Sequence, residues 1–374
     1  MWPALPSPRA LIEPAETLLI GAAGGLLFTF LGFPAGLVSG SVLAVTAAAL
    51  LGRPVKVPTA LARVCYVIVG ILLGAVVTPE TLRGFTTWPA SVALLMIASV
   101  AMIVATSSYL RVVHHWDPLS ALMGASPGSM IQVIALSTEL GADLRAIAIV
   151  QTVRVLLLTI GIPSGLALFG LVAPAVPVAR GPAGLSSLPD MLVVVAVSVA
   201  AALTMARLRF PGGLLFGAMA GSAVLHGSGL AQAVLPWWVG SAAVVVLGAV
   251  VGSRFANTTL RLIFGYLGAA VGSFTVSVAI TTVFLLLAIR FFPFPIANVV
   301  VAFSPGAQDT MMVLALALHL DPVYVGAHHV GRFLVVTFTV AIAARRIAKN
   351  RNAQNRHADG RTTKPGSADK TGEK

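Results

Sequence analysis

The residues best suited to chemistry are concentrated in a short polar motif inside an otherwise apolar stretch. Serine is a preferred helix N-cap and proline a preferred first helical residue, so the motif predicts that a helix begins inside the apolar zone. The first N–H groups of a helix have no partner within it and carry partial positive charge, which favours an anionic or carboxylate-bearing ligand. The candidate substrate-binding residues of this motif are Ser304, Pro305, Gly306 and Gln308.

A second copy of the motif lies earlier in the chain, at an offset of 178 residues from Ser304 to Ser126. If both helix starts meet near the middle of a membrane, they form a polar cup for a solute. The alternative is that proline and glycine only kink two packed helices. The candidate substrate-binding residues of this copy are Ser126, Pro127, Gly128 and Gln132.

Asp309 is the acidic residue of greatest interest, because a carboxylate inside a membrane segment is a functional candidate by default. The chain has only twelve Asp and Glu residues. Asp309 falls in the first turn of the predicted helix, where the helix dipole favours its charge. We expect it to couple a proton or a cation to the solute, with Arg332 lining the same cavity and Ser304 capping the helix. The alternative is an acid that only stabilises the helix start.

A pair of arginines follows the two motifs within the next apolar runs. Arg154 and Arg332 each lie eleven residues after an aspartate, Asp143 or Asp321. A buried guanidinium needs a partner or a water-filled cavity, and it can bind a carboxylate through two hydrogen bonds. We therefore assign both arginines to substrate binding. The alternatives are ion pairs with the two aspartates, or side chains that extend toward the membrane surface.

Histidines cluster near Asp321 and could relay protons, because histidine titrates near neutral pH. A metal site is the less favoured interpretation, since the adjacent His328 and His329 would diverge by about 100° on a helix. No metal or other cofactor is expected. The coupling candidates are Asp309, Asp143, Asp321, His319 and His329.

Both motifs belong to an internal duplication. At the same offset, Gly70 and Gly74 coincide with Gly248 and Gly252, and glycines at this spacing suit close helix packing. A homo-oligomer interface at these glycines is the alternative. The predicted organisation is a first membrane repeat over 1–172, a Pro-rich linker over 173–189, a second membrane repeat over 190–345 and a disordered basic tail over 346–374.

The elements that must position these residues are membrane helices. The chain is 57% hydrophobic and 10% charged, whereas a soluble domain carries about 25% charge. Each half contains five apolar runs long enough, or nearly so, to cross about 30 Å of hydrocarbon, plus one run interrupted by Ser-Pro-Gly. The predicted fold class is therefore an all-α polytopic membrane protein, with about ten transmembrane helices in two five-helix repeats.

Loop charges bear on whether the interrupted segments cross the membrane or re-enter it. If they re-enter and the N-terminus is cytoplasmic, only Arg83, Arg180 and Arg290 among the loop arginines and lysines fall outside, as the positive-inside rule favours. If the segments cross, several more basic residues move outside. Five passes per half is an odd number, so the two repeats would be inverted. Both termini are then expected in the cytoplasm.

Two long segments carry a family resemblance. They are ASPGSMIQVIALSTELGADLRAIAIVQTVRVLLL in the first half and FSPGAQDTMMVLALALHLDPVYVGAHHVGRFLVV in the second. They resemble the bacterial AbrB-duplication membrane proteins, and the resemblance covers about residues 15–345. Members have also been labelled ammonia monooxygenases or AbrB-family regulators. The resemblance implies a multi-pass protein of the bacterial inner membrane and carries over no established site residues.

Three functions compete. Broken helices in an inverted duplication favour a secondary transporter or exporter of a small anionic or zwitterionic solute. The second hypothesis is a membrane-bound regulator of gene expression that acts through the tail, although no DNA-reading module is visible and no nucleic-acid partner is expected. The third is a metal-dependent, ammonia monooxygenase-like enzyme, for which the chain offers no convincing ligand set. The expected partners are a small solute and the lipid bilayer.

Overall fold

The computed structural model describes residues 8–77, 87–127, 130–172, 188–231 and 233–362. Within those ranges every regular element is helical. The helices of the first half are α1 (Pro8–Phe30), α2 (Gly36–Leu50), α3 (Thr59–Gly74), α5 (Pro89–His114), α6 (Pro118–Ala125), α7 (Met130–Leu140) and α8 (Leu144–Leu168). Those of the second are α9 (Leu188–Arg207), α10 (Gly213–Gly227), α11 (Trp237–Gly252), the 3-10 helix η2 (Ser253–Phe255), α12 (Leu260–Phe291), α13 (Ile296–Phe303), α14 (Gln308–Ala317) and α15 (Pro322–Thr362).

Six of the described helices are long and apolar enough to cross a membrane: α5, α8, α9, α11 with η2, α12 and the first part of α15. Three further apolar helices, α2, α3 and α10, have 15 or 16 residues. The predicted all-helical membrane class is therefore confirmed. The layout of ten spans in two repeats stays a prediction, because helix length alone does not place a bilayer.

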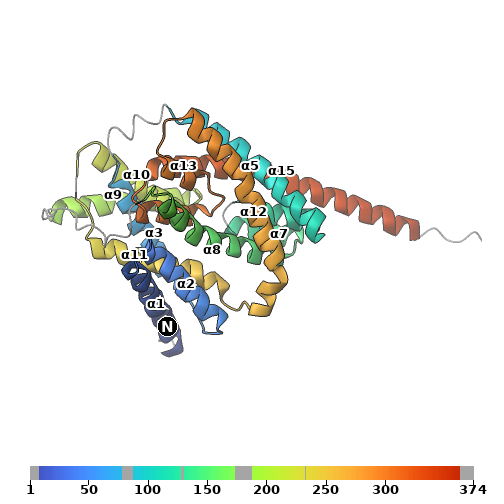
Figure 1. The fold of residues 1–374 in the computed structure, drawn as a ribbon, viewed down its shortest axis with the longest axis horizontal. Coiled ribbons are helices and arrows are strands. Elements are labelled where there is room, and N and C mark those ends of the chain that lie inside the picture. Colours follow the sequence, from blue (N-terminus) through green and yellow to red (C-terminus); the bar gives the residue numbers. More distant parts are fainter. Residues whose placement is uncertain (1–7, 78–86, 128–129, 173–187, 232, 363–374) are drawn as a thin grey trace, which may run out of the picture.

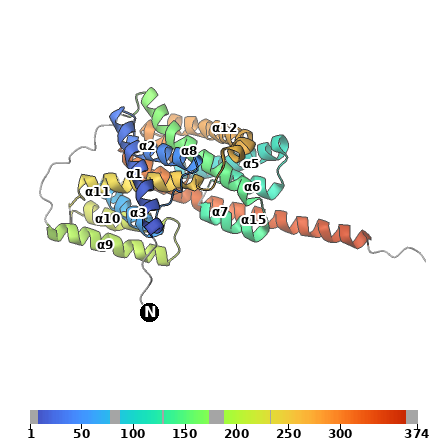
Figure 2. The ribbon, with the colours of Figure 1, turned by 90° about the horizontal axis from the view of Figure 1, so that it is seen from below.

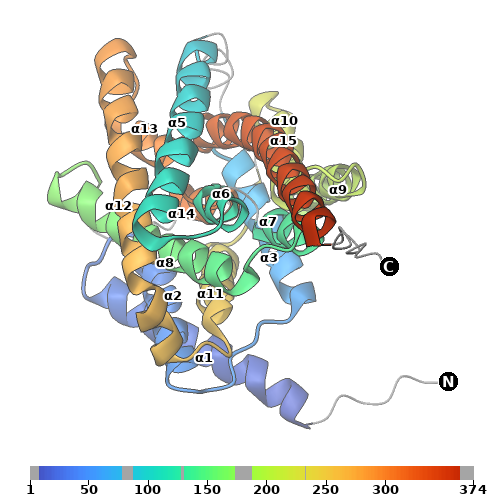
Figure 3. The ribbon, with the colours of Figure 1, turned by 90° about the vertical axis from the view of Figure 1, so that its right-hand side faces the viewer.

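The helices assemble into two groups (Figures 1 and 2). The first three helices of each half pack together, α1–α3 with α9–α11, and we call this the six-helix group. The short η2 directly follows α11, contacts α2 and α11, and is counted with this group. The remaining helices, α5–α8 and α12–α15, form the eight-helix group, in which α5 and α12 lie side by side (Figure 3). The short helix α14 of the second group contacts α2, α3 and α11 of the first. The boundary between the groups therefore runs past the second Ser-Pro-Gly motif.

Close helix packing within the six-helix group explains the matched glycines. Gly70 and Gly74 on α3 face α10, where an added Cβ would lie 2.4 Å from a backbone oxygen at either position. Gly248 and Gly252 on α11 face α2, where an added Cβ would approach a side chain or backbone oxygen within 2.8 Å. Each half thus packs a glycine-bearing helix against the second helix of the other half. The glycines serve contacts inside one chain.

Replacing Gly74 with alanine is expected to destabilise the protein by about 1–3 kcal/mol, because the methyl group would overlap the Met219 carbonyl oxygen. Gly265→Ala is the matched control, since no atom lies within 4 Å of its added Cβ. Alanine is the better helix former by about 1 kcal/mol at both sites, so the control should be neutral or stabilised. Thermal unfolding in detergent measures both, and equal stability of the two variants would contradict this packing.

Helix α15 continues well past the membrane repeat predicted to end at residue 345. It runs to Thr362 and projects away from the rest of the molecule (Figure 1). The bounds of the second repeat and the disordered tail from residue 346 stay predictions. Ala348 is buried, and Ile347 packs against the cluster that contains Met102 and Leu119. Apolar contacts therefore extend the packed part of the helix beyond residue 345.

Candidate functional site

Each Ser-Pro-Gly segment forms a hairpin of two short helices whose ends meet. The Asp143 N–H donates to Ser120 Oγ at 2.8 Å, which joins the end of the α6–α7 segment to its beginning. The Asp321 N–H donates to Asn298 Oδ1 at 3.2 Å and closes the α13–α14 segment in the same way. A straight pair of such helices would separate its ends by roughly 28 Å. The chain therefore folds back on itself, as the re-entrant alternative requires.

Asp143 and Asp321 cap the helices that follow the hairpins. Asp143 Oδ1 accepts hydrogen bonds from the N–H groups of Arg145 and Ala146 at 3.0 and 3.1 Å. Asp321 Oδ1 accepts from Val323 and Tyr324 at 2.9 and 3.1 Å. These bonds satisfy N–H groups that have no intrahelical partner. They account for both carboxylates without a role in proton coupling, which stays a prediction.

Arg154 and Arg332, which the 178-residue duplication offset relates, bind the unwound tips of the hairpins. Arg332 donates to the carbonyl oxygens of Ser304 and Gly306 at 2.5 and 2.8 Å. Arg154 donates to Ala125 and Ser126 at 3.3 and 3.0 Å. Both arginines are buried, at 4% and 5% exposure. Arg332 lies about 16 Å along α15 from Asp321, a length that is about half the thickness of a hydrocarbon layer.

A second side chain supports each tip. His329 Nε2 lies 3.2 Å from the Val301 carbonyl oxygen, and Gln151 Nε2 donates to Met123 at 3.0 Å. The His329 ring also contacts Arg332 through Nδ1 at 2.6 Å. A guanidinium only donates, so Nδ1 accepts and the hydrogen resides on Nε2. His329 is thereby held as a neutral tautomer that satisfies a helix-end carbonyl.

Gln151 is a site residue that sequence reasoning missed. It lies 178 residues before His329, and its acceptor Met123 lies 178 residues before Val301. The duplication offset that pairs Arg154 with Arg332 therefore also pairs Gln151 with His329. Applying the offset to every polar residue near the motifs would have found it.

The predicted capping role of Ser304 is wrong. Ser304 is the residue that ends α13, and its hydroxyl donates to Val300 at 2.6 Å. Helix α14 begins only at Gln308, after Ala307, and no side chain caps it. Arg332 binds two carbonyl oxygens of this stretch and Ser304 has an extended ψ of 136°. The peptide between the two helices is thus held open, and the helix start moves past the motif's serine and proline.

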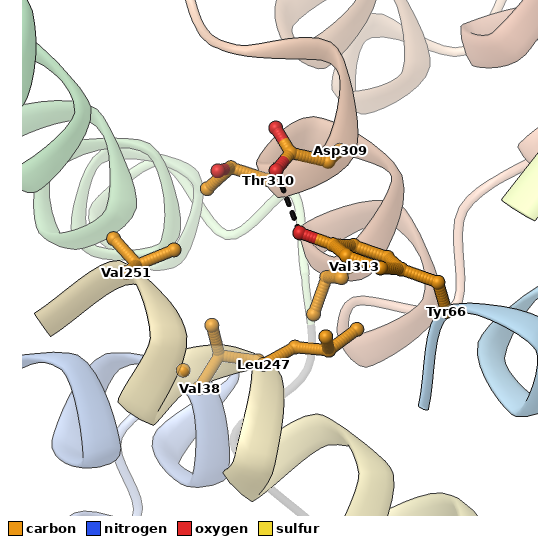
Figure 4. Close-up of a pocket in the computed structure, with 8 residues that line it drawn as sticks. Val38, Tyr66, Leu247, Val251, Asp309, Thr310 and Val313 are labelled. Atoms are coloured by element: carbon orange, nitrogen blue, oxygen red, sulfur yellow. Dashed lines mark hydrogen bonds between the residues drawn. The ribbon is translucent and has the colours of Figure 1, made fainter. Parts of the chain in front are cut away.

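Asp309 lies in a pocket at the boundary between the two helix groups (Figure 4). Its Oδ2 accepts a hydrogen bond from the Tyr66 hydroxyl at 2.9 Å and forms an ion pair with Arg254 at 3.2 Å. Both partners belong to the six-helix group, on α3 and η2. The expectation that Arg332 accompanies Asp309 is therefore corrected: Arg254 is its cation, because Arg332 is engaged by the hairpin tip. The pocket is lined by Val38, Tyr66, Leu247, Gly248, Val251, Asp309, Thr310 and Val313.

Thr310 adds a buried hydroxyl group to this pocket. It is 3% exposed, and its Oγ1 has no hydrogen-bond partner among the described residues. Threonines elsewhere in these helices donate to the carbonyl four residues earlier, as Thr152 does to Ala148. For Thr310 that residue is Gly306, which lies before the helix start and whose carbonyl accepts from Arg332. The hydroxyl is therefore left available beside Asp309.

The other predicted site residues do not gather in this pocket. Gln308 points toward Gly212, with its Nε2 buried and unpartnered within the described chain. His319 is exposed and has a positive φ of 54° directly after α14. Ser126 and Pro127 lie at the first hairpin tip, Pro305 and Gly306 at the second, while Gly128 and the Gln132 side chain fall outside the described residues. In the part of the chain that is described, no group of three or more His, Cys, Asp or Glu side chains could hold a metal.

The fold and the site define a helical membrane-type protein with two hairpins of short helices and a polar pocket between two helix groups. The family model described as "Transition state regulatory protein AbrB" matches residues 37–348. The chain belongs to this AbrB family.

Two relatives match over most of their length. "Uncharacterized protein YhjN" of Bacillus subtilis (strain 168) is 26% identical over 356 residues, covering 87% of this chain and 91% of that protein. "Putative regulator AbrB" of Escherichia coli (strain K12) is 25% identical over 300 residues, covering 79% of this chain and 84% of that protein. These similarities confirm the resemblance carried by the two motif segments.

Proposed function

We infer that this protein is a secondary transporter of a small anionic or zwitterionic solute in a bacterial inner membrane. The observation that carries the proposal is the position of the Asp309 pocket. Asp309 and Thr310 come from a short helix of the eight-helix group, while Tyr66 and Arg254 come from the six-helix group. A small displacement of one group against the other would break these bonds and open the pocket, which is how alternating access operates.

The repeat arrangement supports the same proposal. Contacts between helices recur when the halves are exchanged: α2 packs on α11 as α10 packs on α3, and α8 packs on α12 as α15 packs on α5. We propose ten spans in two inverted five-helix repeats, with both hairpins re-entering and both termini cytoplasmic. Hairpin tips held roughly 15 Å from the starts of α8 and α15 fit a solute site near the membrane midplane.

The charge of the pocket favours an anion over a cation. The uncapped start of α14 contributes about half a positive charge, and Arg254 contributes one more. Asp309 offsets one charge, so the local balance stays positive. A free metal cation would be repelled by the guanidinium and by the helix start, whereas a carboxylate would gain from both.

Access to the pocket from both sides of the membrane is the test. In a Cys65→Ala background, Val251→Cys would place a thiol in the pocket wall. A membrane-impermeant thiol reagent is then applied to right-side-out and to inside-out vesicles. We expect labelling from both sides, because a transporter opens its site alternately. A panel of organic acids and amino acids should then contain a solute that shifts the ratio of the two labelling rates.

A membrane-bound regulator gives a different result. A regulator that senses a ligand needs the pocket open to one side only, so labelling confined to one vesicle orientation, with every solute, would overturn the transport proposal. Introducing cysteine at Leu286, which is exposed on α12, reports the background reaction of a lipid-facing thiol.

A further inference from the structure

We propose that the Asp309 pocket binds a short-chain monocarboxylate together with one proton. The proposal rests on the proposed transport function and specifies its substrate class and its coupling ion. Three features of the pocket support the proposal: a polar end with hydrogen-bond donors that lack acceptors, the Asp309 carboxylate already paired with Arg254, and an apolar wall.

The polar end offers donors suited to a carboxylate group. The Thr310 hydroxyl is buried and has no partner among the described residues. The first N–H groups of α14 have no intrahelical acceptor, and no side chain caps that helix. Arg254 lies within ion-pair distance of Asp309 at this same end. A carboxylate bound here would accept from the hydroxyl, the helix start and the guanidinium together.

The charges at this end call for a proton when the carboxylate binds. The helix start and Arg254 together carry about one and a half positive charges, which balance one carboxylate but not two. A second carboxylate beside an ionised Asp309 is therefore repelled unless one of the two is protonated. The groups that face Asp309 are Tyr66 from α3 and Arg254 from η2, while α2 and α11 present Val38, Leu247, Gly248 and Val251. The cationic and imidazole side chains of α8 and α15 nearest the hairpins, Arg154, His328, His329 and Arg332, are bonded elsewhere. Asp309 is therefore the group that accepts the proton.

The binding step transfers one proton and makes or breaks no other covalent bond. Asp309 takes up a proton from the surrounding solution and becomes neutral. Arg254 then exchanges Asp309 for the incoming carboxylate, while the Tyr66 hydroxyl stays in contact with the protonated acid. In the present structure the Asp309 bonds leave a cavity volume of only about 10 Å³, no more than one water requires. Release of Arg254 is thus what opens the space.

The apolar wall selects against solutes with a second charge. Val38, Leu247, Val251 and Val313 form the apolar wall of the pocket, with Val38 and Leu247 on the side away from Asp309 (Figure 4). An alkyl chain of a few carbons would pack there. An ammonium group or a second carboxylate would be buried against these side chains without a partner, which is costly. Monocarboxylates should therefore bind more tightly than amino acids or dicarboxylates.

Propionate is the probe, and binding to the purified full-length protein is the readout, because propionic acid itself diffuses through bilayers. Titration calorimetry in buffers of different ionisation enthalpy gives both affinity and proton uptake. We expect about one proton per propionate and an affinity that falls about tenfold per pH unit above neutrality. Asp309→Asn, which keeps the hydrogen bond to Tyr66 but removes the charge, should bind propionate with no pH dependence and no proton uptake.

Two threonine variants locate the site. Thr310→Val should weaken propionate binding about tenfold or more, the effect of losing a hydrogen bond to a charged group. Thr46→Val is the matched control, because Thr46 is also buried with an unpartnered hydroxyl but does not line the pocket. Its affinity for propionate should be unchanged.

The outcomes separate this inference from the function on which it rests. Binding of an amino acid or a dicarboxylate, but not of propionate, overturns the substrate class and leaves transport standing. Propionate binding without proton uptake, or with pH dependence retained in Asp309→Asn, overturns the coupling. A pocket labelled from only one side of the membrane, whatever it binds, overturns the transport function instead.

Discussion

Replacing Arg332 with methionine is expected to remove most of the folded protein from the membrane. The guanidinium is the donor for the carbonyl oxygens of Ser304 and Gly306 and for His329 Nδ1. Each buried carbonyl left without a partner costs about 1–3 kcal/mol. The Ser304 carbonyl would keep only the Gly306 N–H, while the Gly306 carbonyl and His329 Nδ1 would lose the Arg332 donor. Their combined loss is a large share of the roughly 5–15 kcal/mol by which proteins are typically stable. Arg332→Lys should retain part of the stability, since an ammonium lacks the planar fork that reaches both oxygens.

The control for this variant lies on the same helix. Arg345 is exposed on α15, and Arg345→Met should leave thermal unfolding in detergent unchanged. The amount of folded monodisperse protein and its unfolding temperature are the two measurements. An Arg332→Met protein that unfolds at the wild-type temperature but no longer binds any solute would contradict this structural role. The guanidinium would then act on the solute, as its position inside an apolar run suggests.

Replacing Arg254 with glutamine is expected to weaken solute binding strongly while sparing the fold. The Arg254 and Asp309 side chains are 18% and 31% exposed, so the loss of their ion pair should cost little stability. Binding should weaken by a factor of about 10–150, because a hydrogen bond to a charged group contributes about 1.5–3 kcal/mol. Affinity for the stabilising solute and thermal unfolding, measured side by side, separate the two effects.

Arg261→Gln is the appropriate comparison for Arg254→Gln. Arg261 lies seven residues further on and is exposed in the first turn of α12, so its loss removes the same charge from the same region without touching the pocket. Equal loss of binding in both variants would point to a general effect of surface charge. Unfolding of the Arg254 variant at a clearly lower temperature would instead show that the ion pair mainly stabilises the packing of the two helix groups.

Part of this architecture can be predicted from local sequence patterns. Apolar runs of span length fix the helical membrane class because lipid leaves the backbone no other partner than itself. Proline and glycine inside such runs mark where α6 and α13 end, since proline cannot continue the hydrogen-bond ladder. The common offset also pairs Arg154 with Arg332 and Asp143 with Asp321, and it carries the same contacts in both halves. Asp309 lies in the first turn of a helix, as the sequence predicts, while its coupling role stays a prediction.

Partner identity, in contrast, was decided only by the tertiary structure. Tyr66 lies 243 residues before Asp309, and Arg254 lies 55 residues before it. In the sequence alone, Tyr66 cannot be told from an aromatic residue at the membrane interface, and Arg254 cannot be told from a basic residue in a loop. The sequence pairs Arg332 with Asp309 because Arg332 lies well inside an apolar run. In the folded hairpin the Arg332 guanidinium instead donates to the carbonyl oxygens of Ser304 and Gly306, which lie where the helix hydrogen bonding is interrupted. The chain alone therefore determines which segments are helical and which groups are scarce, while packing between the two helix groups determines which of those groups meet.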